Sequence, residues 1–415
     1  MKRLLLINFL LLNLLYAKTL TLQESIDKTL SNHPDIKSFA LKIEQSQAGY
    51  RSAYSNYLPQ INAQAQYNAV QTFVFPFNGV FNTVDDDSWS AGVALKQKIW
   101  DFSKTSAKVD AFAVDEKISK LSLADLKALM VYRVKALYDS MIVQEEAIRV
   151  REKDLESKKA YYDQAKALVR NGLKTEADAS RFLSAVYIAQ DNLAIAKATY
   201  MKAKSTLSLY MNEEIDDDVE LENKLLQRDF SASQNIEKNI EDENYQLKIY
   251  KYTTEKNRLL HKSAKASHYG SIDAYASYTH FDTLNTYDSK LAGISLSIPI
   301  YSGGMLSAEA QKAEIAAQIS SEQKASKLLA LKDELNALLI DIERYNKTIA
   351  AKKAQMQSAL NTKSVLEGRY KEGLATYIEV LDATSLVLNA KLGLLEAYYQ
   401  KSMAINRIEY LKGKI

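Results

Sequence analysis

The chain has 415 residues, a formal net charge of +3 from 54 basic and 51 acidic side chains, and no cysteine. This balance argues against a nucleic-acid-binding surface, and the absence of thiols excludes disulfides, thiolate metal sites and cysteine nucleophiles. The histidines have no metal-ligand spacing near a carboxylate pair, so we expect no metal site and no cofactor. Phosphate-binding glycine loops and nucleophile motifs do not stand out, and we predict that the chain is not an enzyme.

Residues 1–17 have the form of an export signal. Lys2 and Arg3 precede an apolar run over 4–15, and Ala17 supplies a small residue at the cleavage point. The run is interrupted by two asparagines and is too short for a membrane span. We therefore expect a mature chain beginning at Lys18 that is either periplasmic or located in the outer membrane.

The mature sequence contains one unit twice. A shift of 201 positions aligns the copies from the second strand onward, pairing Gly172 with Gly373 and Leu137 with Leu338. Upstream the shift is 211, which we attribute to a longer hairpin loop over 73–87 in the first copy. We predict a first repeat over 18–212, an acidic equatorial linker over 213–232 and a second repeat over 233–415.

Each repeat begins with a predicted strand hairpin, at about 60–100 and about 271–300. In the first run Ile61, Ala63, Ala65 and Tyr67 alternate with polar residues. This length and period match outer-membrane strands, although a half-buried sheet of a soluble protein alternates in the same way. Aromatic residues near the strand ends and the small size of the apolar partners favour contact with outer-membrane lipid.

Four strands do not close a barrel, and open sheet edges are not tolerated in lipid. The chain is therefore expected to oligomerise, and three chains of four strands would give a twelve-stranded barrel.

A proline-free stretch of about 110 residues follows each hairpin and is interrupted by a glycine turn, at 172 or at 373. Apolar residues recur in it at an average spacing of 3.5, which predicts left-handed coiled-coil packing. These positions are Leu328, Leu331, Leu335, Leu338, Ile342, Tyr345, Ile349 and Met356, with Met130, Val134, Leu137, Met141, Ile148 and Leu155 in the first copy. About 70 residues of helix would extend roughly 100 Å, which suits the wall of a tube. A plain coiled-coil rod is the alternative.

Three short segments carry a family resemblance. Residues 370–383 place a tyrosine before Gly373 and a valine–leucine–aspartate–alanine step after it. Residues 296–304 resemble a last strand turning into a helix, and Asn32-His33-Pro34 fits a first-helix signature. In this order, and with the internal duplication, the sequence resembles the TolC-type outer-membrane efflux proteins over nearly the whole mature chain.

The resemblance implies a mainly α fold with a small β part. It implies a homotrimer in which long coiled-coil helices form an α-helical barrel, continued by a twelve-stranded outer-membrane β-barrel with four strands from each chain. The turns at Gly172 and Gly373 would lie at the periplasmic tip, where a periplasmic adaptor (membrane fusion) protein and an inner-membrane pump dock. Such a duct does no chemistry of its own.

Two carboxylates after the second turn are candidates for the channel gate. Glu379 and Asp382 are three residues apart on one helix face, so three copies would form rings of negative charge around a narrow aperture. Thr376–Glu379 and Thr175–Asp178 also match the capping-box pattern, so capping and gating both stay open for Glu379 and Asp178. Asp382 lies one turn deeper, where capping does not explain it.

The resemblance also implies a latch between the two tip hairpins, in which Tyr370 hydrogen-bonds Asp178. The basic residue expected two positions after Gly373 is Ala375 in this chain. Arg181 occupies the position equivalent to Asp382 and is a candidate substitute, with an ordinary surface arginine as the alternative. We therefore expect a tip that is leakier or differently locked.

Three functions fit the sequence. The first is the passive outer-membrane channel of a tripartite efflux system that exports small molecules or metal ions. The second is the same duct in a type I protein-secretion system, and the third is a soluble periplasmic coiled-coil adaptor or structural rod. For the apolar loop over 73–84 two interpretations stay open: it folds over the barrel mouth, or it contacts a surface layer.

Overall fold

The computed structural model describes residues 19–217, 219–225, 230 and 235–413. The predicted signal peptide at 1–17 lies outside the described residues, as does part of the predicted linker. The chain divides into two compact units. Unit 1 combines Met1–Lys37, Ala124–Asn244 and Leu328–Ile415, and unit 2 combines Ser38–Leu123 and Tyr245–Lys327.

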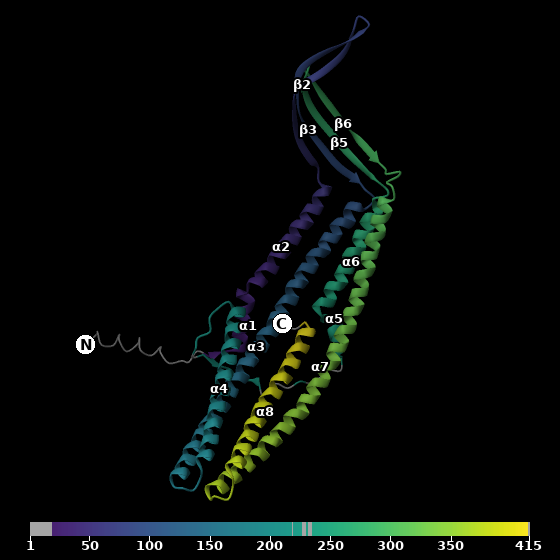
Figure 1. Cartoon of the computed structure of the whole chain (residues 1–415). Helices are drawn as coiled ribbons and strands as arrows, with labels where there is room; N and C mark the ends of the chain where they lie inside the picture. The colour runs from purple at the N-terminus through teal and green to yellow at the C-terminus, as the bar shows by residue number, and fades with distance from the viewer. Residues whose placement is uncertain (1–18, 218, 226–229, 231–234, 414–415) are drawn as a thin grey trace, which may run out of the picture. The chain divides into compact units, whose positions relative to one another are not determined.

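Unit 2 contains a four-stranded antiparallel sheet built from both predicted hairpins (Figure 1). Its strands are β2 (Gln60–Phe77), β3 (Val80–Trp100), β5 (Ser271–Asp282) and β6 (Tyr287–Ser297), in the order β2-β3-β5-β6. The alternating sequence pattern therefore forms strands where it was predicted to. The outer strands β2 and β6 each leave one edge of the sheet unpaired within the chain.

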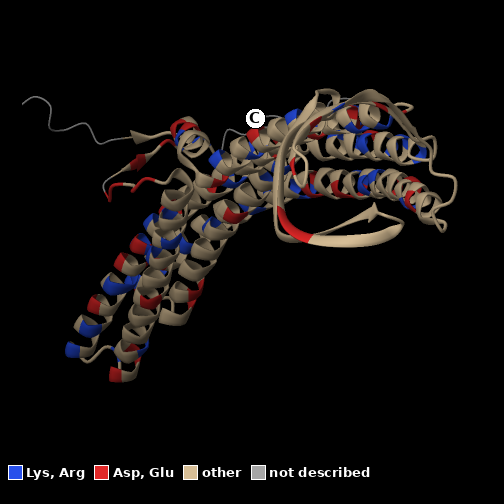
Figure 2. Ribbon diagram, turned by 90° about the horizontal axis from the view of Figure 1, so that it is seen from above, with Lys and Arg blue, Asp and Glu red and all other residues tan. Residues whose placement is uncertain are grey.

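The expected long loop over 73–87 is wrong, because β2 and β3 continue through it. Their cross-strand pairs extend to Phe77 and Val80, and the connection is the two-residue turn Asn78-Gly79. Both turn residues have positive φ, +52° and +79°, and Asn-Gly is the preferred pair for such a turn. In Figure 2 this hairpin consists almost wholly of uncharged residues apart from one acidic segment.

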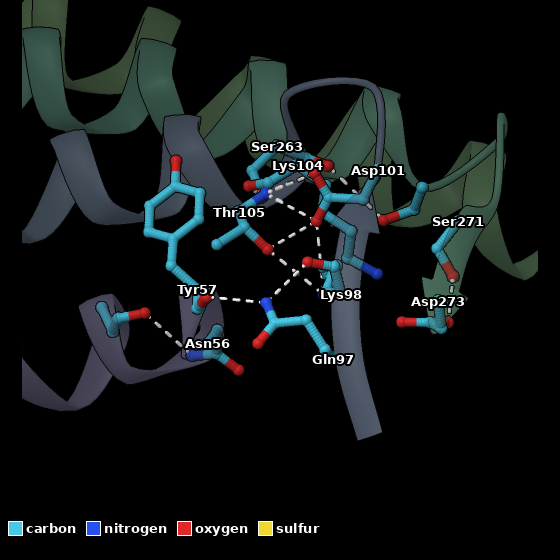
Figure 3. Close-up of polar contacts among 12 residues, drawn as sticks. Asn56, Tyr57, Gln97, Lys98, Asp101, Lys104, Thr105, Ser263, Ser271 and Asp273 are labelled. Carbon is cyan, nitrogen blue, oxygen red and sulfur yellow. Dashed lines mark hydrogen bonds and ion pairs between the residues drawn. The ribbon is translucent and has the colours of Figure 1, made fainter. Parts of the chain in front are cut away.

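A buried carboxylate fixes the turn from β3 into helix α3 (Lys104–Arg170). Asp101 is 7% exposed and accepts a hydrogen bond from the Thr105 backbone N–H at 3.0 Å, while the Lys98 ammonium lies 3.3 Å from it (Figure 3). Phe102 and Ser103, which follow Asp101, both have left-handed φ values, +54° and +72°. Such a backbone is costly for residues with a Cβ, so the Asp101 contacts hold a turn that its own residues disfavour.

The equivalent turn in the second copy uses two glycines. Gly303 and Gly304 stand 201 positions after Phe102 and Ser103 and have φ of +61° and +82°. They lead into helix α7 (Met305–Lys371). The backbone path of the two copies is thus the same although the residues that adopt it differ.

The remaining helices of unit 2 make side-chain contacts between the two sequence repeats. Helix α2 (Pro34–Tyr54) begins in unit 1 and continues into unit 2, followed by the 3-10 turn η1 (Ser55–Tyr57), and helix α6 (Tyr245–Ala266) precedes β5. Lys256 on α6 forms an ion pair with Asp115 on α3 at 2.6 Å.

Unit 1 holds the rest of the long helices and their turns. It contains α1 (Leu22–Asn32), α4 (Glu176–Met211), α5 (Ile236–Glu243) and α8 (Tyr377–Leu411). It also contains a small parallel pair, β1 (Thr19–Leu20) with β4 (Glu220–Leu221), so the predicted linker includes a strand. The buried Tyr138 fixes this pair, because its hydroxyl donates to the Leu20 carbonyl at 2.6 Å and accepts from the Glu222 N–H at 2.9 Å.

The predicted coiled-coil positions lie on the buried faces of α3 and α7. Leu331, Leu335, Ile342 and Ile349 are between 2% and 7% exposed, and Val134 is fully buried. Each of the two helices has 67 residues, so each extends about 100 Å at 1.5 Å per residue. Their bounds differ by 201 positions at both ends, as the repeat predicts. None of the helices in the described ranges is long and apolar enough to cross a membrane.

Candidate functional site

The two long helix hairpins of unit 1 end in equivalent glycine turns. Gly172 follows α3 with φ +70°, and Gly373 follows α7 with φ +74°. In each turn the next residue bonds back to the helix: the Leu173 N–H reaches the Leu168 carbonyl at 3.0 Å, and the Leu374 N–H reaches the Arg369 carbonyl at 2.8 Å. This Schellman-type closure needs a left-handed residue and explains the glycine. Leu173 and Leu374 are each 67% exposed.

An aromatic cluster joins the two helix hairpins behind these turns. Phe182 on α4 is fully buried, and its ring lies 5.5 Å from the Tyr377 ring, 6.0 Å from the Tyr161 ring and 6.3 Å from the Tyr370 ring, measured between centroids. The tilted and edge-on geometries are those that aromatic pairs favour. The cluster therefore holds the α3–α4 hairpin against the α7–α8 hairpin.

A partly buried hydrogen bond crosses the same contact. The Tyr161 hydroxyl donates to the carboxylate of Glu367 on α7. Burial, together with this negatively charged acceptor, raises the pKa of Tyr161 to about 12. Tyr161 therefore remains neutral and able to donate throughout the physiological pH range.

Ala375 and Arg181 replace the expected basic latch with apolar and aromatic contacts. Ala375 is 6% exposed and packs in the aromatic cluster, where a basic side chain would have no water. The Arg181 guanidinium lies over the Tyr377 ring, 5.4 Å from its centroid. Such a cation–π contact stabilises the packing of Arg181 against Tyr377, and it needs no carboxylate partner for the guanidinium.

The carboxylate of Asp178 serves as a helix cap. It accepts hydrogen bonds from the Thr175 N–H at 3.1 Å and the Thr175 hydroxyl at 2.9 Å, which completes a capping box at the start of α4. Both bonds lower the pKa of Asp178. Tyr370 is 5% exposed, and its hydroxyl makes no hydrogen bond to Asp178 in this structure. A direct latch between these two residues stays a prediction.

Glu379 has the same capping role at the start of α8. Its carboxylate accepts from the Thr376 N–H at 2.6 Å and the Thr376 hydroxyl at 2.8 Å, and these bonds lower its pKa. Asp382 lies one turn further along, is exposed, and makes no hydrogen bond or ion pair with the residues that the structure describes. Both carboxylates are exposed, whereas the adjacent Val380 and Ala383 are buried. Capping is therefore observed for Glu379, and gating stays a prediction for both carboxylates.

Phe182, Tyr161 and Tyr377 were not predicted from the sequence. The signal was present in the comparison of the two repeats, since the position equivalent to Phe182 is Ala383 and that equivalent to Tyr161 is Thr362. Large aromatic residues that lack a counterpart mark contacts that only one copy makes. Within the described part of the chain, no group of three or more acidic or histidine side chains is placed to hold a metal ion.

The family model described as "Outer membrane efflux protein" matches residues 25–213 and 243–414. The chain belongs to this family. The family is one of channels of the outer membrane rather than of enzymes, and the sequence-based assignment to TolC-type proteins and to the outer membrane is confirmed.

Similar proteins cover the chain to different extents. The outer membrane protein TolC of Vibrio cholerae is 21% identical over 418 residues, covering 95% of this chain and 91% of that protein. The outer membrane protein TolC of Escherichia coli K12 is 32% identical over 133 residues, and that match spans 32% of this chain and 27% of that protein. A crystal structure of CusC has a TM-score of 0.86 at 16% identity, covering 95% of this chain and 92% of that one. This last likeness concerns the fold.

Proposed function

We propose that three copies of this chain form the outer-membrane channel of a tripartite efflux system. The channel is a passive duct that exports small molecules or metal ions. An inner-membrane pump supplies the energy, and a periplasmic adaptor connects the pump to the duct. Family membership removes the soluble adaptor or rod as an alternative. The observation that carries the proposal is the four-stranded sheet with an unpaired edge on both β2 and β6.

The free edges support the trimer. Unpaired backbone groups are not tolerated in lipid, so β6 of one copy pairs with β2 of the next until the sheet closes. Three sheets of four strands give a twelve-stranded barrel, which is wide enough for an aqueous path. In this barrel the face with Ile61, Ala63 and Ala65 contacts lipid, and the alternate polar face lines the pore.

The tip of the helix hairpins supports a gated periplasmic entrance. Glu379 and Asp382 are exposed on α8, and three copies would place two rings of negative charge around the entrance. The aromatic cluster around Phe182 holds the two hairpins of each chain together, and we propose that it is the lock of the closed state. Arg181 contributes to this lock through the Tyr377 ring.

The exposed leucines support adaptor docking at the same end. Leu173 and Leu374 follow Gly172 and Gly373 in turns that have the same backbone conformation. An adaptor can therefore engage both hairpins of each chain through one type of apolar contact. The pump reaches the duct through this adaptor.

The test uses the full-length chain expressed with its signal in a strain that lacks its own outer-membrane efflux channels. We expect a heat-modifiable trimer in the outer-membrane fraction and lower cellular accumulation of a fluorescent efflux substrate when the cognate pump and adaptor are present. A monomer in the soluble fraction would contradict the proposal. A trimer that leaves accumulation unchanged but secretes a protein substrate would assign the duct to type I secretion instead.

A further inference from the structure

The β2–β3 hairpin continues beyond the other two strands of the sheet. Pairing between β3 and β5 starts at Trp89 with Asp282, and the β5–β6 pairs end at Phe281 with Tyr287. Pairing between β2 and β3 continues to the Asn78-Gly79 turn, so residues 71–86 form a two-stranded ribbon by themselves (Figure 1). An isolated two-stranded ribbon is only marginally stable in water, so this one needs a surface to pack against.

A β-bulge marks the start of this ribbon. Asn68 pairs with Ser88 and Gln71 pairs with Asp86, so β2 has one more residue than β3 between these pairs. The Asn68 amide donates to the Ser88 hydroxyl at 3.0 Å and to the Gln71 side chain at 3.3 Å. Asn68, Gln71 and Ser88 therefore point to the same face of the sheet, and the face can be followed across the bulge.

Beyond the bulge this face becomes apolar. Its apolar residues, here called the apolar stripe, are Phe73, Phe75, Phe77, Val80 and Val84; Asn82 lies among them, and Gln71 and Asp86 lie at the base of this face. Phe77 and Val80 are each 63% exposed, and Phe75 is 38% exposed. Below the bulge the same face carries polar side chains: Gln60, Asn62, Gln64, Gln66 and Asn68.

The opposite face becomes polar only at the base of the ribbon. Below the bulge it carries Ile61, Ala63 and Ala65, whereas just beyond it the Thr72 hydroxyl donates to Asp85 at 2.7 Å. Val74, Pro76 and Phe81 follow on this face toward the tip of the ribbon. Beyond the bulge this face is therefore polar at the base of the ribbon and apolar again at its tip, whereas the face that carries Gln60–Asn68 below the bulge becomes mainly apolar.

A row of polar and aromatic groups lies near the level of the bulge, on the face of the sheet that carries Ile61, Ala63 and Ala65. The Trp89 indole donates to Asp282 at 2.8 Å, and the His280 ring lies 2.8 Å from Asp288. Such groups are typical of the membrane–water interface. The ribbon starts where the lipid-facing band ends, so it lies in water on the outer side.

The apolar stripe then faces the pore axis. In the proposed barrel the face with Gln64 and Gln66 lines the pore, and the stripe continues that face. The ribbon from Gln71 to Phe77 spans about 20 Å, whereas twelve strands at about 4.8 Å spacing form a ring with a radius of roughly 10 Å, somewhat more with tilt. Ribbons from three copies are long enough to meet on the axis.

We propose that the apolar stripe is an interface between copies of this chain, in which three ribbons pack together over the outer mouth of the duct. The inference rests on the proposed trimer. Packing would bury the three phenylalanine rings of each copy, and the acidic side chains Asp85 and Asp86 at the base of the ribbon would remain in water. An apolar closure of this kind resists ion flow by excluding water.

The natural chain contains no cysteine, so single substitutions report directly on this contact. Phe75→Cys places a thiol on the stripe, and Val74→Cys places one on the opposite face of the same strand. A disulfide needs Cα atoms within about 7 Å. After oxidation of full-length protein in outer membranes, we expect Phe75→Cys to give covalent dimers on denaturing gels and Val74→Cys to remain monomeric.

Failure of this inference differs from failure of the proposed function. If the unoxidised variants form heat-modifiable trimers but Phe75→Cys does not cross-link, or cross-links no more than Val74→Cys, the interface is wrong and the duct stands. If neither variant nor the natural chain forms trimers, the proposed function fails first. Quenching of a fluorophore on Phe75→Cys by lipid-phase quenchers would place lipid on the stripe and overturn the interface.

A functional readout uses the same two faces. The triple variant Phe73→Ser, Phe75→Ser, Phe77→Ser should raise the single-channel conductance in planar bilayers several-fold, because the ribbons lose the surface that joins them. The control Val74→Ser, Phe81→Ser alters the opposite face and should leave the conductance unchanged. Equal conductance of the triple variant, the control and the natural chain would contradict a closure by the stripe.

Discussion

Replacing Phe182 with alanine should open the tip of the helix hairpins. The side chain is fully buried and faces three tyrosine rings at centroid distances of 5.5 to 6.3 Å. Loss of a buried phenylalanine costs about 3–5 kcal/mol, and aromatic pairing contributes roughly 0.5–1.5 kcal/mol per pair beyond burial. Phe182 contacts only the end of the hairpins, so this cost falls on local opening of the tip rather than on unfolding of the whole chain.

Hydrogen exchange of the assembled full-length protein measures this effect. In Phe182→Ala, amides over 161–182 and 366–381 should exchange about a hundredfold faster or more, because about 3 kcal/mol corresponds to two decades in the opening equilibrium. Phe182→Leu keeps most of the apolar volume, so its amide exchange rates over these segments should lie between those of the natural chain and those of Phe182→Ala. Tyr187→Ala is the surface control, since Tyr187 lies on the same helix and is 61% exposed.

Unchanged protection of both segments in Phe182→Ala would refute the reasoning. It would mean that the two hairpins are held together by other contacts and that the cluster is not the lock. Faster exchange over the strands of unit 2 as well would indicate general destabilisation instead of local opening.

Four further predictions concern neighbouring groups. Tyr161→Phe should remove one tyrosine that titrates near pH 12 from an ultraviolet difference titration. Folding raises the pKa of Tyr161 above the ordinary value of about 10. The stability that the neutral Tyr161 contributes is therefore present below pH 10 and is lost as the pH rises toward 12. Thr376→Ala should cost about 1 kcal/mol by removing a helix cap, and Thr376→Ser should restore it in thermal melts of the trimer. Asp382→Asn should lower the cation selectivity measured by reversal potentials, whereas Asn389→Asp, at an exposed position two turns further along the same helix, should raise it. Ser103→Gly should stabilise unit 2 by about 1 kcal/mol, because glycine adopts the left-handed backbone without strain; no gain in melting temperature would show that the turn is not strained.

The repeat allowed most of the fold to be predicted. An unbroken shift of 201 positions placed α3 and α7 and their glycine turns, and the 3.5-residue spacing identified the buried faces that contain Val134 and Leu331. These features depend on local periodicity and on single residues such as Gly373, which sequence displays directly. The family resemblance added the outer-membrane setting.

Other features depended on contacts between distant segments. The aromatic cluster brings Tyr161, Phe182 and Tyr377 together from three helices, and no local pattern marks it. The ribbon beyond the sheet was predicted as a loop because its apolar residues do not alternate with polar ones, although Asn78-Gly79 already indicated a hairpin turn. The capping role of Glu379 was one of two local interpretations, and only the side-chain geometry shows that it is satisfied.

Planar-bilayer recording of the purified full-length protein tests the central claim most directly. Three chains that form a duct with a locked tip should give discrete, cation-selective conductance steps, and Phe182→Ala should make these steps larger. Trimers that carry Phe182→Ala together with Phe73→Ser, Phe75→Ser and Phe77→Ser, and that insert into the bilayer without conducting, would contradict the account, because both proposed closures are then removed.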